Sequence, residues 1–346
     1  MGLWLSSTTS SPARCPVWWI TLWIDQPKDD WRYAYQAVSD RQLIVKNGTV
    51  MKKMLITGGS GFVGGHLAEQ ANNNYEVHAL FNNNPIQIKN IYTHQFDLYR
   101  TSQIDGLLNH ICPDVIIHTA AVANPDWCED DPDAAIQLNI KATEGLAKWA
   151  ENNGTRFIFT STDMVFDGAR GNYKESDPPN PISFYSNTKV TAEEFIANNN
   201  SNYVIARVAL VYGIGITSHN SFFEKMIEKL KKAEAITLFY DQYRSPILVD
   251  NLVEALLELT ENDFVGIIHL GGSERISRWQ FGVKACEMLQ LPCQNISKGS
   301  MFDFAATAFR PRDISLVNDL AKQVLKVKLL NCDEGLERIK NNYKII

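Results

Sequence analysis

Three features are scarce in this chain of 346 residues: paired cysteines, long apolar runs and clusters of basic residues. None of the six cysteines forms a C-x-x-C pair, and no two histidines have metal-ligand spacing. We therefore expect no metal, and reduced thiols in a cytoplasmic protein. The apolar run at residues 16–24 is too short to span a bilayer, which takes about 20 residues. The net charge of -6, without a long basic run, argues against a nucleic-acid partner.

What the chain does have is a glycine-rich turn at residues 53–66, KMLITGGSGFVGGH. The pattern indicates a strand, a tight turn and the first turn of a helix. Gly58, Gly61 and Gly64 leave no Cβ where a pyrophosphate would approach the backbone and where the helix must pack on the strand. The free N–H groups of the helix would face the phosphates. This predicts a dinucleotide site, with a plain tight turn as the alternative.

About fifty residues precede this turn, and their composition is unusual. They contain five of the eight tryptophans: Trp4, Trp18, Trp19, Trp23 and Trp31. They show no convincing helical or strand period, and Met51 resembles a natural start. We interpret residues 1–50 as an N-terminal extension outside the domains, which translation from an upstream start codon would explain. A membrane-surface or partner anchor is the lower-ranked alternative.

Strands and helices alternate after the turn. Apolar strands are expected at 75–81, 91–96, 114–118, 156–160 and 203–208, and a helix at 133–152. This alternation predicts an α/β fold with a doubly wound parallel sheet of the Rossmann type over residues 51–213. Residues 214–346, with a helix at 222–232 and short strands such as 266–270, are expected to form mainly a smaller C-terminal α/β lobe that binds substrate.

A second motif is the Tyr185–Lys189 pair, four residues apart and therefore on one helical face. A lysine near a phenol is expected to lower the pKa of the phenol, and such a tyrosine can protonate a carbonyl oxygen as hydride arrives. Thr162, at the end of the strand before it, could hydrogen-bond the same oxygen. Taken alone, the Tyr185–Lys189 pair is typical of the exposed side of an amphipathic helix. Thr162, taken alone, is typical of a residue that caps the end of a strand.

Together, these motifs resemble the extended short-chain dehydrogenase/reductase family, and within it the dTDP-4-dehydrorhamnose reductase-like, sugar-nucleotide-binding branch. The resemblance rests on TGGSGFVG at 57–64, STDMVFDG at 161–168 and YSNTK at 185–189. It continues at HTAA (118–121), LNIKAT (138–143), DQYRSP (241–246) and RPRDISL (310–316), and covers roughly residues 52–345.

The resemblance implies a role for each matching position. It implies a catalytic set of Thr162, Tyr185 and Lys189. It implies that the cofactor is bound by Gly58, Gly61, Phe62, Val63, Gly64, Asn82, Asp97, Leu98, Ala120, Ala121, Asn139, Tyr185 and Lys189. Of these, Asn139 matches a structural asparagine on the helix behind the site. For the substrate it implies Asp163, Asn220, Arg244, Arg310 and Arg312. The three arginines suit a diphosphate, with surface salt bridges as the alternative.

Several positions depart from related families. After the second strand, residues 81–84 (FNNN) offer neither the acidic residue of many NAD enzymes nor an arginine for NADP. We expect NADP or NAD, with NADPH slightly favoured. Met164 replaces the glutamate of sugar-nucleotide dehydratases, which argues against elimination. Leu210 stands where rhamnose-pathway reductases often have tryptophan, and Ser186 replaces the usual glycine.

The expected function is an NAD(P)H-dependent oxidoreductase that reduces a 4-keto sugar nucleotide, as in dTDP-rhamnose biosynthesis. Hydride would pass to C4 of the sugar, with Tyr185 as proton donor. The expected partners are a nucleotide-sugar substrate and a second copy in a homodimer. One alternative is a non-catalytic NADP-binding regulatory subunit resembling the beta subunit of methionine adenosyltransferase. Another is a sugar-nucleotide epimerase.

Deletion of residues 1–50 tests the interpretation of the extension. We expect a chain that starts at Met51 to fold, stay in solution and keep its cofactor affinity, because the extension carries no motif and no periodic pattern. Circular dichroism and cofactor titration of both chains provide the comparison. Aggregation of the shortened chain would show that the extension is needed for a folded protein in solution. Loss of a membrane association that the full chain has would show that the extension binds the membrane.

Overall fold

The computed structural model describes residues 45–46, 49–217, 221–304 and 306–343. The chain divides into two units, residues 1–51 and 52–346. In the first unit, β1 (Val45–Lys46) and β2 (Thr49–Val50) pair antiparallel. The expectation for residues 1–50 otherwise falls on residues outside those described. No described helix is both long and apolar enough to cross a membrane.

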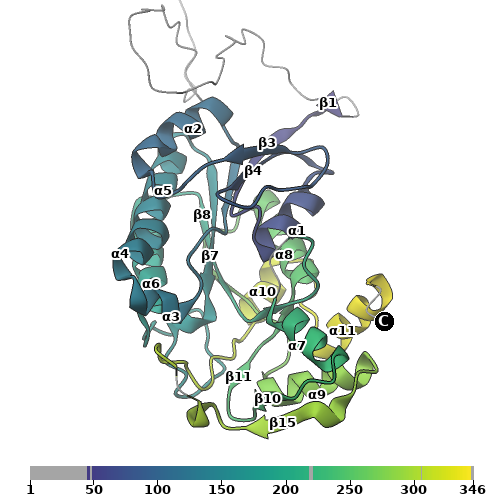
Figure 1. Ribbon diagram of the computed structural model, residues 1–346. Coiled ribbons are helices and arrows are strands. Elements are labelled where there is room, and N and C mark those ends of the chain that lie inside the picture. The colour runs from purple at the N-terminus through teal and green to yellow at the C-terminus, as the bar shows by residue number, and fades with distance from the viewer. Residues whose placement is uncertain (1–44, 47–48, 218–220, 305, 344–346) are drawn as a thin grey trace, which may run out of the picture. The chain divides into compact units, whose positions relative to one another are not determined.

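The second unit is built on a sheet of seven strands in the spatial order β5–β4–β3–β6–β7–β8–β13 (Figure 1). The strands are β3 (Lys52–Thr57), β4 (Tyr75–Phe81), β5 (Tyr92–Gln95), β6 (Val115–His118), β7 (Arg156–Thr162), β8 (Tyr203–Val208) and β13 (Gly266–Leu270). All of their pairings are parallel. The strands that follow β3 in the chain are first added on one side of it, as β4 and β5, and then on its other side, beginning with β6. The direction of strand addition therefore reverses between β3 and β6, and ligands bind at such switch points in open α/β sheets.

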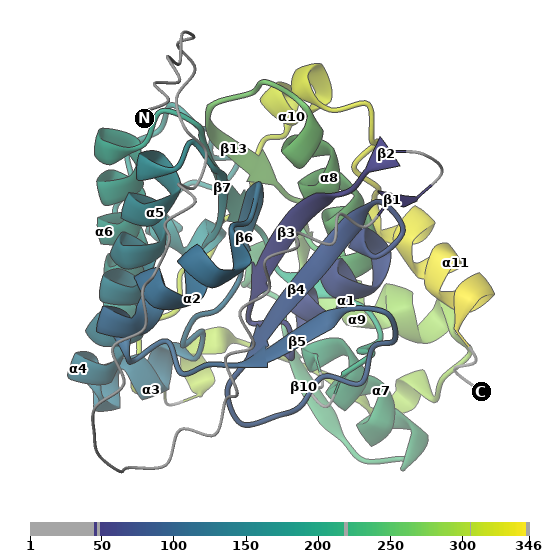
Figure 2. The ribbon, with the colours of Figure 1, turned by 90° about the horizontal axis from the view of Figure 1, so that it is seen from above.

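Helices cover both faces of this sheet, as Figure 2 shows. One face carries α1 (Phe62–Ala71), α8 (Val249–Glu261) and α10 (Asp319–Val324). The other carries α2 (Ile104–Ile111), α5 (Ala142–Asn152) and α6 (Phe184–Asn199). The predicted doubly wound α/β fold is confirmed.

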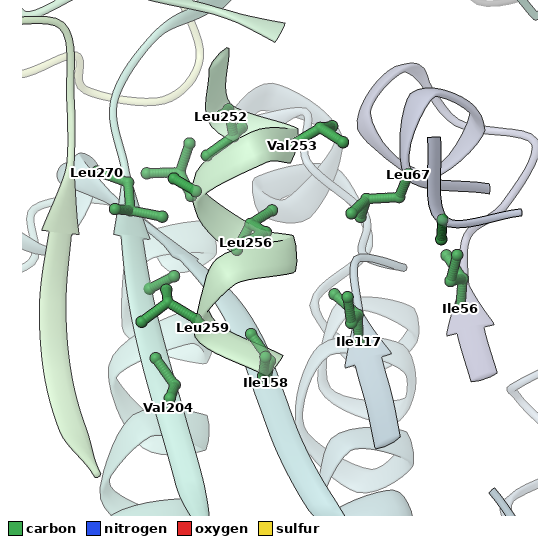
Figure 3. Close-up of a cluster of buried hydrophobic side chains, with 14 of the residues drawn as sticks. Ile56, Leu67, Ile117, Ile158, Val204, Leu252, Val253, Leu256, Leu259 and Leu270 are labelled. Carbon is green, nitrogen blue, oxygen red and sulfur yellow. The ribbon is translucent and has the colours of Figure 1, made fainter. Parts of the chain in front are cut away.

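The packing of α8 on the sheet shows why its sequence forms a helix here. Leu252, Leu256 and Leu259 recur at spacings of four and three residues, so they share one helical face. All three are fully buried and point toward the strands, among side chains such as Ile158 and Val204 (Figure 3). Truncating one buried leucine of this kind typically costs about 2–5 kcal/mol of stability.

The strand at residues 266–270 does not belong to the smaller lobe, and this corrects the sequence-based placement. As β13 it pairs with β8 in register from Gly266↔Val204 to Leu270↔Val208 and completes the large sheet. Its last residues are buried beside the core cluster that includes α8. The sequence indicates an apolar strand, but strand partners far away in sequence cannot be read from an apolar run alone.

Other C-terminal elements lie past the carboxyl ends of the large sheet (Figure 1). They include the strand pairs β9 (Val211–Tyr212) with β12 (Ile247–Leu248), β10 (Ile236–Phe239) with β15 (Ile296–Gly299), and β11 (Tyr243–Arg244) with β14 (Ile276–Ser277). The helices α7 (Phe222–Lys231), α9 (Arg278–Met288) and α11 (Cys332–Asn342) share a second core with Phe223, Phe281 and Leu336. The helix expected at 222–232 is α7.

The helix expected at 133–152 is interrupted. It consists of α4 (Pro132–Ala135), a π-helical segment Ile136–Lys141 and α5. The short α3 (Pro125–Asp130) precedes it. A π-helical insertion shifts which residues face inward, and such insertions are frequent at functional sites.

Candidate active site

The glycine turn joins β3 to α1 with little room for side chains. Gly58 has φ +68°, a left-handed conformation that favours glycine, and a Cβ there would lie 2.9 Å from the Ala120 backbone. A Cβ on Gly64 would overlap the carbonyl oxygen of Gly58. Gly61 donates its N–H to the same carbonyl at 2.8 Å. These glycines therefore allow α1 to begin directly against the end of β3.

The start of α1 fits the phosphates of a dinucleotide. The N-cap residue Gly61 offers no side-chain cap, and the first turn holds no acidic residue. A Cβ built on Gly61 would meet only the Gly58 carbonyl oxygen, at 3.1 Å, so the rest of its surroundings is open. The first N–H groups of the helix, which Phe62, Val63 and Gly64 carry, suit an anion at this point.

The other residues expected at the cofactor follow neighbouring strands. Asn82 is exposed just after β4, while Asp97 and the buried Leu98 come after β5. Ala120 and Ala121 come after β6. Because the strands are parallel, these residues gather at the same sheet edge as the glycine turn.

A buried hydroxyl ties β6 to β3 beside the turn. Thr57 Oγ1 lies 2.6 Å from His118 Nδ1 and accepts the backbone N–H of Ala120 at 3.2 Å. His118 Nε2 lies 2.9 Å from the hydroxyl of Thr143. Burial lowers the pKa of His118 to about 3, so the ring is neutral at neutral pH. His118 is therefore a structural hydrogen-bonding group here.

Thr162 and Tyr185 meet at the carboxyl end of β7. Thr162 is the last residue of β7 and accepts the N–H of Met164 at 3.2 Å, as a cap for the turn Asp163–Val165. The strand-end cap considered from the sequence is therefore present. Tyr185 lies in the first turn of α6, is buried, and is near enough to Thr162 for that side chain to affect its pKa.

The pKa of Tyr185 differs from the sequence-based expectation. Burial raises it above the usual value for tyrosine, and the nearby Thr162 side chain opposes that rise only in part. The expected lowering by Lys189 is not what the structure shows, because the Lys189 ammonium lies over the Phe159 ring, 3.9 Å from its centroid. Tyr185 consequently stays protonated at neutral pH, which suits a proton donor.

Lys189 is itself almost fully buried, on the same helix as Tyr185. Burial lowers the pKa of its ammonium to about 7, and Glu193, one turn further along α6, opposes this. Glu193 in turn accepts from the Ser161 hydroxyl and forms a buried ion pair with Arg207 Nη2 at 2.7 Å. Sequence reasoning assigns no role to Ser161 or Glu193. The only indication for Glu193 is that it lies four residues after Lys189, a spacing that places the two side chains on one helical face.

Asn139 lies in the π-helical segment behind Lys189. Its side chain accepts the Val122 N–H at 2.8 Å and donates to the Thr188 hydroxyl at 3.1 Å. Asn139 thus links the chain after β6 to α6 at the residue before Lys189. The structure places it as a positioning group, and the π-helical turn that achieves this has no clear sequence signature.

The residues expected at the substrate fall into different environments. Asp163 is buried, follows Thr162, and its Oδ2 has no hydrogen-bond partner among the described residues. Arg244 is also buried and donates to the carbonyls of Tyr243 at 2.6 Å and Pro311 at 3.0 Å. Arg310 forms a salt bridge with Asp126 at 2.6 Å, which is the alternative considered from the sequence. Arg312 is exposed, and Asn220 lies outside the described residues.

Burial raises the pKa of Asp163 to about 6, although the nearby Arg244 opposes the rise. An unpartnered carboxylate oxygen inside a protein is costly unless a ligand completes its bonds. No group of three or more potential metal ligands occurs within the described ranges.

Three comparisons relate this chain to known proteins. The sequence model of one family, the RmlD substrate binding domain, matches residues 51–345. The probable low-salt glycan biosynthesis reductase Agl14 of Haloferax volcanii is 33% identical over 222 residues, 63% of this chain and 74% of that protein. The methionine adenosyltransferase 2 subunit beta of Bos taurus is 28% identical over 253 residues, 71% of this chain and 74% of that protein.

Among solved structures, dTDP-4-dehydrorhamnose reductase from Bacillus anthracis, in complex with NADP, superposes with a TM-score of 0.76. It is 26% identical, and the match covers 85% of this chain and all of that chain. The similarity therefore spans both the large sheet and the C-terminal elements beyond it.

The substitution Asp163→Asn should stabilise the protein at neutral pH. The carboxyl of Asp163 has a pKa of about 6 in the folded protein, against an ordinary value of 3.8. The folded state therefore binds more protons between these values, and stability falls as pH rises through that window. Removing the charge should raise the free energy of unfolding at pH 7 by up to about 3 kcal/mol, with the gain vanishing near pH 4. Urea denaturation at both pH values measures this.

The exposed Asp319 offers a control, because Asp319→Asn should change the free energy of unfolding little at either pH. If Asp163→Asn matched this control at pH 7, the carboxylate of Asp163 would carry no burial cost.

Proposed function

Since the chain belongs to the family of the RmlD substrate binding domain, we propose that it is an NAD(P)H-dependent reductase of a 4-keto sugar nucleotide, such as a dTDP-linked deoxyhexose. The observation that carries the proposal is the pairing of a buried, protonated Tyr185 with Thr162 at the sheet edge that also holds the glycine turn. The superposition with the NADP complex of a dTDP-4-dehydrorhamnose reductase supports both cofactor and substrate class.

The nicotinamide cofactor, when bound, supplies the hydride. Tyr185 donates its proton to the oxygen at C4 of the sugar, and the Thr162 hydroxyl polarises the same oxygen. Lys189 lies on the same helix, with its ammonium over the Phe159 ring, and would hold the ribose hydroxyls of the cofactor. Asn139 and the Glu193–Arg207 pair hold α6, and so both catalytic side chains, in place.

The glycine turn at 58–64 binds the pyrophosphate of the cofactor, and the residues after β4, β5 and β6 line its remainder. Asn82 follows β4 where many NAD enzymes carry a carboxylate, so no negative charge there repels a 2′-phosphate. We therefore favour NADPH over NADH. The C-terminal elements beyond the large sheet bind the sugar nucleotide.

A second candidate is a non-catalytic NADP-binding subunit. The similarity to methionine adenosyltransferase 2 subunit beta, at 28% identity over 71% of this chain, favours it. The intact Thr162, Tyr185 and Lys189 favour the enzyme. Binding of NADPH without turnover of any sugar nucleotide, together with co-purification of a synthetase, would favour the subunit.

The direct test mixes the purified protein with NADPH or NADH and a panel of nucleotide-linked 4-keto-6-deoxyhexoses, read by mass spectrometry. We expect a product two mass units heavier and an equal amount of oxidised cofactor. An epimerase would instead give an isomer of unchanged mass with no net cofactor oxidation. No conversion of any sugar would contradict the proposal.

Tyr185→Phe keeps the ring and removes the proposed proton donor. Turnover should fall by about 10²–10⁴-fold, the usual contribution of general acid–base catalysis. Cofactor affinity should stay nearly unchanged, because the glycine turn and Lys189 bind the cofactor. Tyr92→Phe, at a half-exposed position on the edge strand β5, is the matched control. A Tyr185→Phe enzyme with a near-normal rate would disprove the assigned role.

Gly61→Val should act on binding instead. A Cβ there would lie 3.1 Å from the Gly58 carbonyl oxygen, so the turn must shift slightly, and the side chain would occupy the space in front of α1. We expect a protein that still folds but whose NADPH affinity falls at least about tenfold. Gly106→Val, in open space on α2, should leave NADPH binding intact. Equal titration curves for Gly61→Val and the unmodified protein would refute the site.

A further inference from the structure

Two cysteines near the carboxyl end of α9 direct their sulfur atoms to the same oxygen. Cys286 lies in the last turn of α9, and Cys293 begins the 3-10 turn Cys293–Asn295 that leads into β15. The Cys286 Sγ donates to the Leu291 carbonyl oxygen at 3.3 Å, and the Cys293 Sγ donates to that oxygen at 3.4 Å. The two thiols are therefore neighbours in space.

The chain reverses between these cysteines, and the reversal is built into the backbone. The Leu291 N–H donates to the Cys286 carbonyl at 2.9 Å. Gln290 has φ +56°, a left-handed conformation that residues other than glycine seldom adopt. Pro292 follows and restricts the backbone that enters the 3-10 turn. The turn thereby places Cys293 against the end of α9, which lies beside β15 (Figure 1).

Solvent reaches the two thiols to different extents. Cys286 is fully buried in the second core, whereas Cys293 is half-buried at the edge of that core. Burial, and then the neighbouring Cys293, raise the pKa of the Cys286 thiol to about 12, so this thiol stays protonated at neutral pH. An oxidant dissolved in water therefore meets Cys293 first, and Cys286 waits behind it as a second thiol.

We propose that Cys286 and Cys293 form a reversible disulfide when the protein meets a peroxide. Hydrogen peroxide oxidises the Cys293 thiol to a sulfenic acid and releases one water. The Cys286 sulfur then attacks the Cys293 sulfur, so that the S–S bond forms and the S–OH bond breaks. The proton of Cys286 leaves with that hydroxyl as a second water. The two thiols give up two electrons, which reduce the peroxide, and a dithiol reductant reverses the reaction.

The disulfide would tie α9 to the chain that enters β15. The helix α9 packs in the second core, and β15 pairs with β10 in parallel register. A cross-link between them constrains the unfolded chain and so stabilises the folded lobe. No step uses the cofactor, Thr162 or Tyr185, so this modification site is independent of the proposed reductase function.

Peptide mapping of the full chain after treatment with hydrogen peroxide tests the proposal. Cleavage after Lys284 and Lys298 leaves both cysteines on one peptide, residues 285–298. We expect this peptide to become about two mass units lighter and to resist thiol alkylation until a dithiol reductant is added. The oxidised protein should also unfold at a higher urea concentration than the reduced protein.

Cysteine variants assign the order of the two sulfurs. In Cys286→Ala the Cys293 sulfenic acid has no second thiol, so dimedone should trap it and excess peroxide should oxidise it further. In Cys293→Ser the buried Cys286 should stay reduced. Cys112→Ser is the matched control, because it alters another partly exposed thiol, on the Asn109 carbonyl, and should keep the cross-link. Mapping of the unmodified protein decides the matter if a core variant does not fold.

Three results would overturn the proposal. In the first, the 285–298 peptide keeps two alkylatable thiols at a peroxide dose that oxidises Cys112. In the second, Cys286 links to Cys332, which is buried in the same core. In the third, Cys293 is over-oxidised equally fast in the unmodified protein and in Cys286→Ala. Each result concerns thiols alone and leaves the test of sugar-nucleotide reduction unaffected.

Discussion

The common direction of the seven strands is the constraint on which the site depends. Because every pairing in the large sheet is parallel, the last residues of β3, β6 and β7 reach one edge. Thr57, His118 and Thr162 are those residues. The glycine turn, the segment at 119–121 and the Thr162–Tyr185 pair follow directly from them. A slip of one residue in register would turn these side chains to the opposite face of the sheet.

Buried charge distinguishes the residues that hold the site from those that face a ligand. Glu193 and Arg207 are both buried, and each satisfies the other at 2.7 Å. Asp163 keeps a buried carboxylate oxygen without a partner among the described residues. A fully paired charge supports the fold, whereas an uncompensated one lowers stability unless something binds. Asp163 directly follows Thr162, at the carboxyl edge of the sheet.

The fold alone does not decide between a reductase and a regulatory subunit, because one scaffold supports both roles. The argument for chemistry rests on particular groups. Tyr185 is buried enough to stay protonated, it lies near Thr162, and Asn139 hydrogen-bonds the helix that carries it. These groups support the proposed reductase over a subunit that only binds the cofactor.

The sequence by itself determined the elements and the chemistry-bearing motifs: the glycine turn, the alternating strands, and the Tyr185–Lys189 pair on one helical face. These depend on local backbone preferences and on periodicity, which neighbouring residues specify. Only the tertiary structure decided that β13 joins the large sheet, that Arg310 pairs with Asp126, and that Lys189 lies over Phe159 and leaves the pKa of Tyr185 raised. Each of these outcomes depends on contacts and burial between residues far apart in the chain, and a linear sequence does not display either one.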